Sequence, residues 1–271
     1  MNDYQGLLSK NHAGRPIGHK IYFYEQTGST NDDAFGLGSE GQPHGTVVIA
    51  DTQTTGRGRM SRSWHSPPGA NIYTSILLRP EFTPARAPQI SIAAGVAVAE
   101  TLHKYCPDKV QLKWPNDVLI AGKKICSILS QMKLSAEAID FIVVGIGINV
   151  NMVKGQLPEE LRETATSLSI ETGHELARSE LIICLFENMA KWYRKLTEEG
   201  FDPVKNKWLS LSPMIGWPVT VRFHDETISG RAAGLGDDGS LAVVTGSSET
   251  IFVSAGDATI IKKAEDYAAG H

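Results

Sequence analysis

The chain has 271 residues, of which 41% are hydrophobic and 21% are charged, and its formal net charge at neutral pH is -4. This composition is typical of a globular protein and gives no indication of a general nucleic-acid or membrane surface. Three cysteines without a close pairing motif argue against a disulfide framework or a cysteine-based zinc site. No apolar run is long enough to span a membrane, so we expect a cytoplasmic protein without a membrane partner.

The first nineteen residues are polar and contain Gly14, Pro16 and Gly18, which predicts an irregular arm over 1–19. This arm is too short for a helix-turn-helix domain, so we expect no DNA partner.

Strand-like residues 21–24 lead into Gly28-Ser29-Thr30-Asn31, a turn with helix-capping residues ahead of a short helix that ends near Leu37. The hydroxyls and the amide of this turn are candidate contacts for a neutral ligand. A plain helix cap is the simpler explanation of these four residues taken alone.

A basic loop covers residues 51–64, after a strand-like run over 46–50, and it has neither helical nor strand periodicity. Gly56 and Gly58 allow its backbone to approach a ligand closely. Its arginines offer fork-shaped donors that match a carboxylate or a phosphate: Arg57, Arg59 and Arg62. The pattern predicts an anion-binding loop, although a solvated basic loop or a nucleic-acid contact would also suit this segment alone.

A strand is predicted over residues 71–78, followed by a helix that Pro84 and Pro88 introduce. The apolar positions of this helix follow the helical period: Ile90, Ala94, Val98, Leu102 and Tyr105. It is therefore interpreted as a core helix.

The motif Lys-Trp-Pro-Asn-Asp at 113–117 precedes a predicted hairpin that turns at an Ala-Gly pair. If the loop has an even number of residues, Leu119 faces Lys124 and Asp117 faces Cys126. Asp117 and Lys124 would then be diagonal neighbours on one face, roughly 7 to 8 Å apart at the backbone. They would point at one site, although a surface salt bridge is the simpler alternative.

The apolar run over 139–151 changes character near its end, where alternate positions are Gly145, Gly147, Asn149 and Asn151. One face of this strand would be core, and the other would be bare backbone followed by carboxamides. A strand lacks side chains where another group must fit, although a bulge or a crossing helix would also explain the glycines.

The last third of the chain predicts helices and then closely spaced strands. Helical signals cover 158–163, a longer segment from an N-cap at Ser179 to about 199, and 203–209. The longer segment has a core stripe at Leu181, Leu185, Met189, Trp192 and Leu196. About five short strands over 214–263 predict a small barrel, and residues 264–271 form a tail.

Taken in order, five motifs closely resemble the biotin-protein ligase family: Gly28-Ser-Thr-Asn31, Gln53 with Gly56-Arg-Gly-Arg59 and Trp64, Lys113-Trp-Pro-Asn-Asp117, Lys124, and Gly145-Ile-Gly-Ile-Asn149. The resemblance covers residues 20 to 262. It implies an α+β fold similar to the class II aminoacyl-tRNA synthetase core, with a mixed sheet and helices on one side over 20–213. An SH3-like β-barrel over 214–263 would follow.

The resemblance also implies a function. A monofunctional ligase of this family uses biotin and ATP with Mg²⁺ to make biotinyl-5'-adenylate. It then transfers biotin to a lysine of a biotin carboxyl carrier domain of a carboxylase. Family members often form homodimers, so a homodimer is possible.

The resemblance implies site roles, residue by residue. The catalytic residues would be Lys124, Arg59 and Asp117, and Asp117 would bind Mg²⁺, orient the lysine or act as a base. The biotin-binding residues would be Ser29, Thr30, Asn31, Gln53, Gly56, Arg57, Gly58, Arg59, Lys124, Gly145 and Gly147. The ATP-binding residues would be Arg57, Arg59, Arg62, Trp64, Lys113, Asn116 and Asn149.

Three positions depart from the family pattern. Met60-Ser61 replaces an Arg-Gly pair in the basic loop, Cys126-Ser127 replaces a pair of small residues, and Gln131 stands where Glu is common. The second departure could narrow the acid pocket, so a lipoate or octanoate ligase or transferase is an alternative. A non-catalytic biotin-binding regulator is another.

Overall fold

The computed structural model describes Tyr4, Leu7 and residues 14–223 and 226–261. The predicted arm over 1–19 lies partly outside the described residues, and the predicted tail over 264–271 lies wholly outside them. No helix in these described segments is long and apolar enough to cross a membrane.

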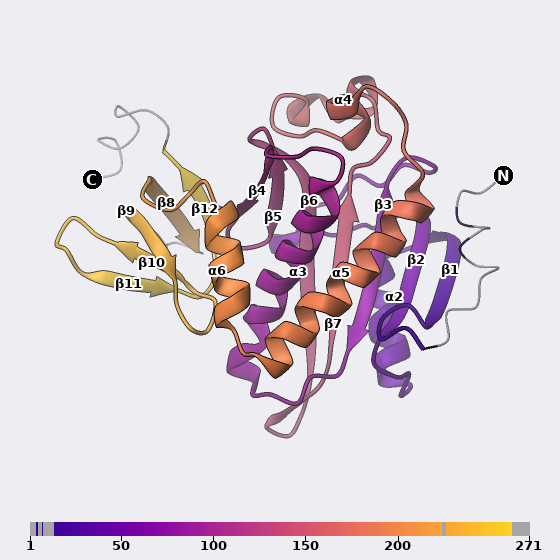
Figure 1. Ribbon diagram of the computed structural model, residues 1–271, viewed down its shortest axis with the longest axis horizontal. Helices are drawn as coiled ribbons and strands as arrows, with labels where there is room; N and C mark the ends of the chain where they lie inside the picture. The colour runs from indigo at the N-terminus through magenta and orange to yellow at the C-terminus, as the bar shows by residue number, and fades with distance from the viewer. Residues whose placement is uncertain (1–3, 5–6, 8–13, 224–225, 262–271) are drawn as a thin grey trace.

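A seven-stranded mixed sheet forms the centre of the molecule (Figure 1). Its strand order is β1-β2-β3-β7-β6-β5-β4, with β1 parallel to β2 and the other neighbours antiparallel. The strands are β1 (Lys20–Thr27), β2 (Thr46–Gln53), β3 (Ile72–Leu78), β4 (Val110–Lys113), β5 (Asp117–Ile120), β6 (Lys123–Ser135) and β7 (Ala138–Ile148). The mixed sheet predicted from the resemblance is confirmed.

Helices cover both faces of this sheet. In Figure 1, α3 (Ala87–His103) and α5 (Arg178–Glu198) lie across the near face, while α2 (Thr30–Ser39) lies behind the strands. Val47 and Ile49 of β2 belong to the main core, whereas Val48 packs with Ala34 of α2 in a separate cluster. The prediction of helices on one side is therefore wrong. Because β2 is buried on both faces, its sequence shows no alternation that would have revealed the second layer.

The longer predicted helices are present with changed ends, whereas one short predicted helix is not an α-helix. The core stripe of α5 is buried as predicted, but the helix starts at Arg178 with Ala177 at its N-cap, so Ser179 is not the cap. The helix predicted over 158–163 is only a 3-10 turn, Glu159–Leu161. The remaining helical elements are 3-10 turns at Arg59–Ser61, Pro84–Arg86 and Lys154–Gln156, and the helices α4 (Leu168–Thr172) and α6 (Asp202–Leu211).

The β5–β6 hairpin turns at Ala121 and Gly122, which both have positive φ. Leu119 faces Lys124, as predicted. Asp117 faces Ser127 rather than Cys126, because a bulge between Val118 and Leu119 shifts the register by one residue. The predicted partner of Asp117 is therefore wrong.

A second, antiparallel sheet forms the C-terminal part of the chain and lies beside α6 (Figure 1). Its strands are β8 (Pro218–Phe223), β9 (Glu226–Leu235), β10 (Leu241–Val244), β11 (Thr250–Val253) and β12 (Asp257–Ile260), in the order β11-β10-β9-β8-β12. Within the described ranges, no pairing of β11 with β12 closes it into a barrel. Buried Trp114 joins the two sheets, since its indole nitrogen donates to the Gly239 carbonyl at 3.1 Å.

Candidate active site

Two adjoining cavities lie where the predicted motifs meet. The smaller one, of about 30 Å³, is lined by the Gly28 turn, by Gln53 and Arg57, and by the glycine face of β7. The larger one, of about 280 Å³, is lined by the basic loop, by Asp117 of β5 and by Lys124 and Ser127 of β6. Trp64 and Ser127 line both cavities, so a ligand of the first can meet a ligand of the second at these two side chains.

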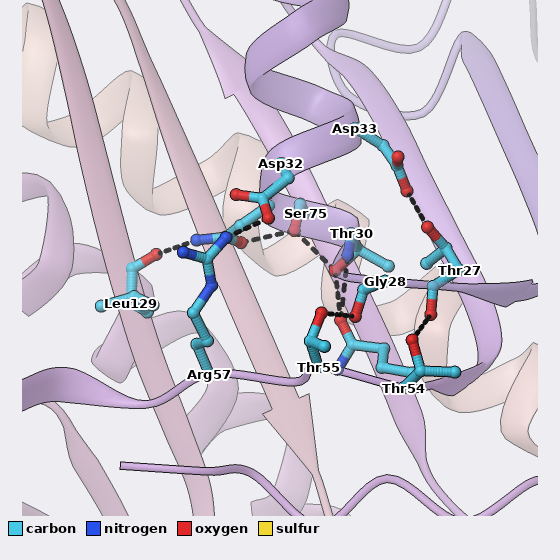
Figure 2. A network of polar contacts seen from close by, with 12 residues as sticks. Thr27, Gly28, Thr30, Asp32, Asp33, Thr54, Thr55, Arg57, Ser75 and Leu129 are labelled. Carbon is cyan, nitrogen blue, oxygen red and sulfur yellow. Dashed lines mark hydrogen bonds and ion pairs between the residues drawn. The ribbon is translucent and has the colours of Figure 1, made fainter. Parts of the chain in front are cut away.

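The smaller cavity is built on neutral hydrogen bonds, part of which Figure 2 shows. The amide and hydroxyl of Thr30 both donate to Gln53 Oε1, at 2.9 and 3.2 Å. The Ser75 hydroxyl lies 2.8 Å from Thr30 Oγ1 and 2.6 Å from Asn31 Oδ1, and Asn31 Nδ2 donates to the Leu129 carbonyl at 3.1 Å. Hydroxyls and amides of this kind suit a neutral ligand that both donates and accepts hydrogen bonds.

The glycines of β7 leave room for two side chains of the site. A Cβ atom at Gly145 would lie 1.9 Å from Asn31 Oδ1, and one at Gly147 would lie 2.6 Å from Trp64 Nε1. The predicted bare face of this strand is confirmed. Trp64 Nε1 is buried without a hydrogen-bond partner among the described residues, so it is a free donor at the junction of the two cavities.

The larger cavity is charged, and its cations are paired with carboxylates. Lys124 Nζ lies 2.7 Å from Asp117 Oδ1, so the predicted acid and cation do meet. Arg59 and Arg62 both contact Asp257 of the C-terminal sheet, with nitrogen-to-oxygen distances of 3.9 and 2.5 Å. Burial lowers the pKa of the Arg59 guanidinium, and the nearby Asp257 and Asp117 carboxylates oppose that shift.

The apolar part of the lining of the larger cavity was not predicted. It consists of Met152, Leu157, Pro158, Leu161 and Ala165. The backbone of Lys124 holds this segment in place: its amide donates to the Thr164 carbonyl at 2.8 Å, and its carbonyl accepts from the Thr166 amide at 2.9 Å. A cavity with an apolar wall, an indole and several cations suits a flat base that carries phosphates.

The other predicted residues fall into three groups. Arg57 lines the smaller cavity and forms an ion pair with Asp32 at the start of α2 (Figure 2). Gly58, Asn116 and Asn149 line the larger cavity. Lys113 lines neither cavity, and Gly56 is buried against Ser66, where a Cβ atom would lie 2.7 Å from the serine hydroxyl.

The departures from the family pattern have different consequences. Cys126 is fully buried in the main core, where burial raises its pKa, and it lines neither cavity; Ser127 alone borders the site. Met60 adopts a left-handed conformation, φ 53°, which is unfavourable for a residue with a side chain. Gln131 has a buried Oε1 atom without a partner in the described part of the chain, for which we have no physical account.

The residues that reach the site from distant parts of the chain were not predicted from the sequence. Tyr73 and Leu129 line the smaller cavity, and His65, Met152 and Asp257 line the larger one. Tyr73 and Leu129 lie in segments that were predicted only as strands, without a polar motif to mark a site. Asp257 lies in the predicted barrel, where a single acid gives no local signal.

Comparisons with known proteins agree with this geometry. Residues 23–149 match the Biotin/lipoate A/B protein ligase family, and residues 214–259 match the Biotin protein ligase C terminal domain. The bifunctional ligase/repressor BirA of Bacillus subtilis is 37% identical over 229 residues, which are 84% of this chain and 70% of that protein. The biotin-acetyl-CoA-carboxylase ligase of Paracoccus denitrificans is 33% identical over 219 residues, which are 80% and 90% of the two chains.

A solved structure of the biotin protein ligase from Aquifex aeolicus, in complex with biotin and ATP, superposes with a TM-score of 0.78 at 30% identity. The match covers 89% of this chain and 99% of that one. A cavity with a neutral hydrogen-bond network that shares lining residues with a cation-rich cavity suits an enzyme that activates a carboxylic acid with a nucleotide. The chain belongs to the biotin protein ligase family.

Proposed function

We propose that this protein is an ATP-dependent ligase that activates biotin as biotinyl-5'-AMP and transfers it to a lysine of a biotin carboxyl carrier domain. The observation that carries the proposal is the junction of the two cavities at Trp64 and Ser127. A biotin ring held by the neutral network would direct its carboxylate toward the cations, where the α-phosphate of ATP would lie.

In the first half-reaction, a carboxylate oxygen of biotin attacks the α-phosphorus, and the bond to pyrophosphate breaks. Two anions must approach each other, so cations are needed to offset their repulsion and to stabilise the charge that develops. Lys124, Arg59 and Arg62 line the cavity in which this occurs. Lys124 is assigned to the reacting oxygens, since it lies 5.7 Å from the centre of the Trp64 ring at the junction.

In the second half-reaction, the lysine amine of the carrier attacks the acyl carbon, and AMP leaves. The deprotonated amine is the nucleophile, so a nearby carboxylate could accept its proton. Asp117 is one candidate, but its 2.7 Å contact with Lys124 favours a role in orienting that lysine. Either role leaves the carboxylate within the site.

Magnesium would enter with the nucleotide. The described residues contain no group of three His, Cys, Asp or Glu that could hold a metal ion by themselves. The cavity does offer the carboxylate of Asp117, and Mg²⁺ is commonly held by one or two carboxylates together with substrate phosphates. These donors fit a metal that is shared with ATP.

Four further assignments belong to this proposal. Residues 20–213 form the catalytic domain, and residues 214–263 form an accessory domain of the SH3-like barrel type, which the resemblance supports. The acceptor is the carrier domain of a biotin-dependent carboxylase, because relatives are named biotin-acetyl-CoA-carboxylase ligases. We infer a cytoplasmic protein with no DNA partner. A homodimer is consistent with the family.

The lipoate or octanoate alternative rested on Cys126-Ser127. Since Cys126 lies in the core and only Ser127 borders the cavities, the motive for a changed acid specificity is reduced to one hydroxyl. A non-catalytic regulator would bind biotin without using the cations of the larger cavity for catalysis. The lining of that cavity does not favour this alternative.

The direct test is the intact mass of a carboxylase carrier domain after incubation with the protein, biotin, ATP and Mg²⁺. We expect a gain of one biotinyl group on the target lysine, and no gain without ATP. Lipoate with a lipoyl domain is the matched control. Modification of the lipoyl domain alone would assign the alternative, and tight biotin binding without any ATP-dependent product would assign the regulator.

A further inference from the structure

The basic loop is anchored by the C-terminal sheet as well as by the domain that carries it. Arg59 Nη1 donates to the Gly256 carbonyl at 3.1 Å and lies 3.9 Å from Asp257 Oδ1. Its third contact is Asn116 Oδ1, at 3.4 Å. Two of the three groups that fix this guanidinium therefore come from the start of β12, almost two hundred residues further along the chain.

Asp257 contacts a second arginine of the same loop. Its other carboxylate oxygen, Oδ2, lies 2.5 Å from Arg62 Nη2, so one carboxylate bridges two guanidinium groups. The side chains of Asp257 and Arg59 are 30% and 24% exposed, whereas that of Arg62 is 69% exposed. All three residues line the larger cavity, and Asp257 and Arg59 form its partly buried pair. Partly buried, bridged charges hold their geometry better than isolated surface pairs, whose side chains must be ordered for little gain.

The backbone around Asp257 is also constrained. Gly256 has φ 134°, and a Cβ atom there would lie 2.8 Å from the Arg222 carbonyl of β8. Asp257 itself pairs with Arg222 in the β8–β12 ladder. Asp257 therefore lies at the start of a strand whose position is fixed by the second sheet. This rigid backbone lets its carboxylate hold the long, flexible side chains of the arginines in one orientation.

An acidic side chain in a cavity that binds a triphosphate must have a compensating role, because its negative charge repels the phosphates. The charged side chains of this cavity, with histidine taken as neutral, are Arg59, Arg62, Lys124, Asp117 and Asp257, or three positive against two negative. Removing Asp257 would make the field more favourable for an anion. Its retention makes sense if the orientation that it gives to two arginines outweighs the repulsion.

We propose that Asp257 is a positioning residue through which the C-terminal sheet holds Arg59 and Arg62 in the orientation that receives the phosphates of ATP. This inference rests on the proposed function, since it takes the nucleotide to be ATP. It assigns the second sheet a direct part in building the nucleotide site. Asp257 does not line the smaller cavity, so the effect is confined to the nucleotide.

The test compares Asp257→Asn with Asp257→Glu and with Asp237→Asn. Asparagine keeps the shape and the strand pairing but removes the charge. Asp237 is the matched control, since it is an acid of the same part of the chain with its own ion pair, 3.2 Å from Lys205, and lies outside both cavities. The binding of a non-hydrolysable ATP analogue and of biotin alone would be measured by titration calorimetry, beside thermal unfolding.

We expect Asp257→Asn to weaken binding of the ATP analogue by about tenfold, as for loss of one charge-assisted contact. Biotin binding should stay unchanged, Asp257→Glu should restore part of the loss, and the control should match the wild type. Unchanged or tighter nucleotide binding by a folded Asp257→Asn protein would overturn the inference. Equal losses for biotin and nucleotide would overturn it too, because they indicate general damage to the fold.

The two proposals can fail separately. A wild-type protein that binds the ATP analogue but never modifies a carrier domain would contradict the proposed function, while the variant could still reveal the role of Asp257. A wild-type protein that biotinylates its carrier normally, with an Asp257→Asn variant that binds nucleotide equally well, would remove only the further inference.

Discussion

The two cavities of the site organise their polar groups in opposite ways. In the smaller cavity, the neutral side chains are satisfied by one another: Thr30, Asn31, Gln53 and Ser75 form one hydrogen-bonded network with little free space, and the one charged residue of the lining, Arg57, is paired with Asp32. In the larger cavity, each cation is paired with a carboxylate around a volume of about 280 Å³. The difference indicates that the smaller cavity is preorganised for one neutral ligand group, whereas the larger cavity holds cations in place for an anionic ligand.

The strongest test of this contrast removes the cation at the junction. In Lys124→Ala, adenylate formation should fall by roughly a thousandfold, because a charge aimed at the reacting oxygens is lost. The rate of biotin-dependent pyrophosphate release would measure it. Lys123→Ala is the control, since its side chain lines neither cavity. Near-normal release by Lys124→Ala would refute the catalytic assignment of this lysine.

A smaller but more selective effect is expected from filling the glycine face of β7. Gly145→Ala places a methyl group on Asn31, which is already bonded to Ser75 and to the Leu129 carbonyl. Biotin should bind about a hundredfold more weakly, since overpacking here displaces the neutral network. Calorimetric titration with biotin would show this.

The control for this variant is Gly234→Ala, where a Cβ atom would meet nothing within 4 Å. Its binding of biotin should equal that of the wild type. If Gly145→Ala also kept its affinity, Asn31 would be free to move, and the description of the smaller cavity as preorganised would be wrong.

The parts of the site that could be predicted from the sequence are those whose chemistry lies within a short segment. The Gly28 turn, the basic loop and the Lys113–Asp117 motif each hold their chemistry within a few consecutive residues, so their patterns indicate function directly. Asp117 and Lys124 could be brought together because a hairpin has a defined register, although the bulge at Val118 moved the partner by one position.

The remaining parts depend on contacts between distant segments. The second layer of helix was missed because β2 is buried on both faces. Asp257 joins the site only because the C-terminal sheet packs against the basic loop, and the apolar wall forms only because the backbone around Thr164 pairs with Lys124. No local pattern encodes either approach, so neither could be read from the sequence.

The network of uncharged side chains in the smaller cavity gives a third prediction, with a smaller expected effect. In Asn31→Asp, a carboxylate oxygen would replace the amide that donates to the Leu129 carbonyl, so a hydrogen bond becomes a repulsion. Biotin affinity should fall by about tenfold, with nucleotide binding unchanged. Asn206→Asp, an exposed position on α6, is the control. A parallel loss of nucleotide affinity would show that the two cavities are not separable.

The smallest effect should come from outside both cavities. Burial lowers the pKa of His44, whose Nδ1 accepts a hydrogen bond from the Arg79 amide at 3.1 Å. Because the folded-state pKa lies below the ordinary value, the contribution of neutral His44 is complete above about pH 6.5 and is lost as the pH falls through the folded-state pKa.

Urea unfolding of wild type and His44→Asn, at neutral pH and near pH 5, would measure this contribution. We expect the variant to lose less stability on acidification than the wild type. Biotin and nucleotide affinities at neutral pH should be the same in both proteins. An identical loss of stability in the two proteins would contradict the assignment to His44.

Activation of biotin by ATP across the two cavities can be measured as the exchange of labelled pyrophosphate into ATP, with biotin, with lipoate and with neither acid. Reversal of adenylate formation is the only route for this exchange, and it needs both cavities but no carrier domain. We expect exchange that depends on biotin, that lipoate does not support and that Lys124→Ala lowers by roughly a thousandfold. Exchange without any acid, or with lipoate in place of biotin, would contradict this expectation.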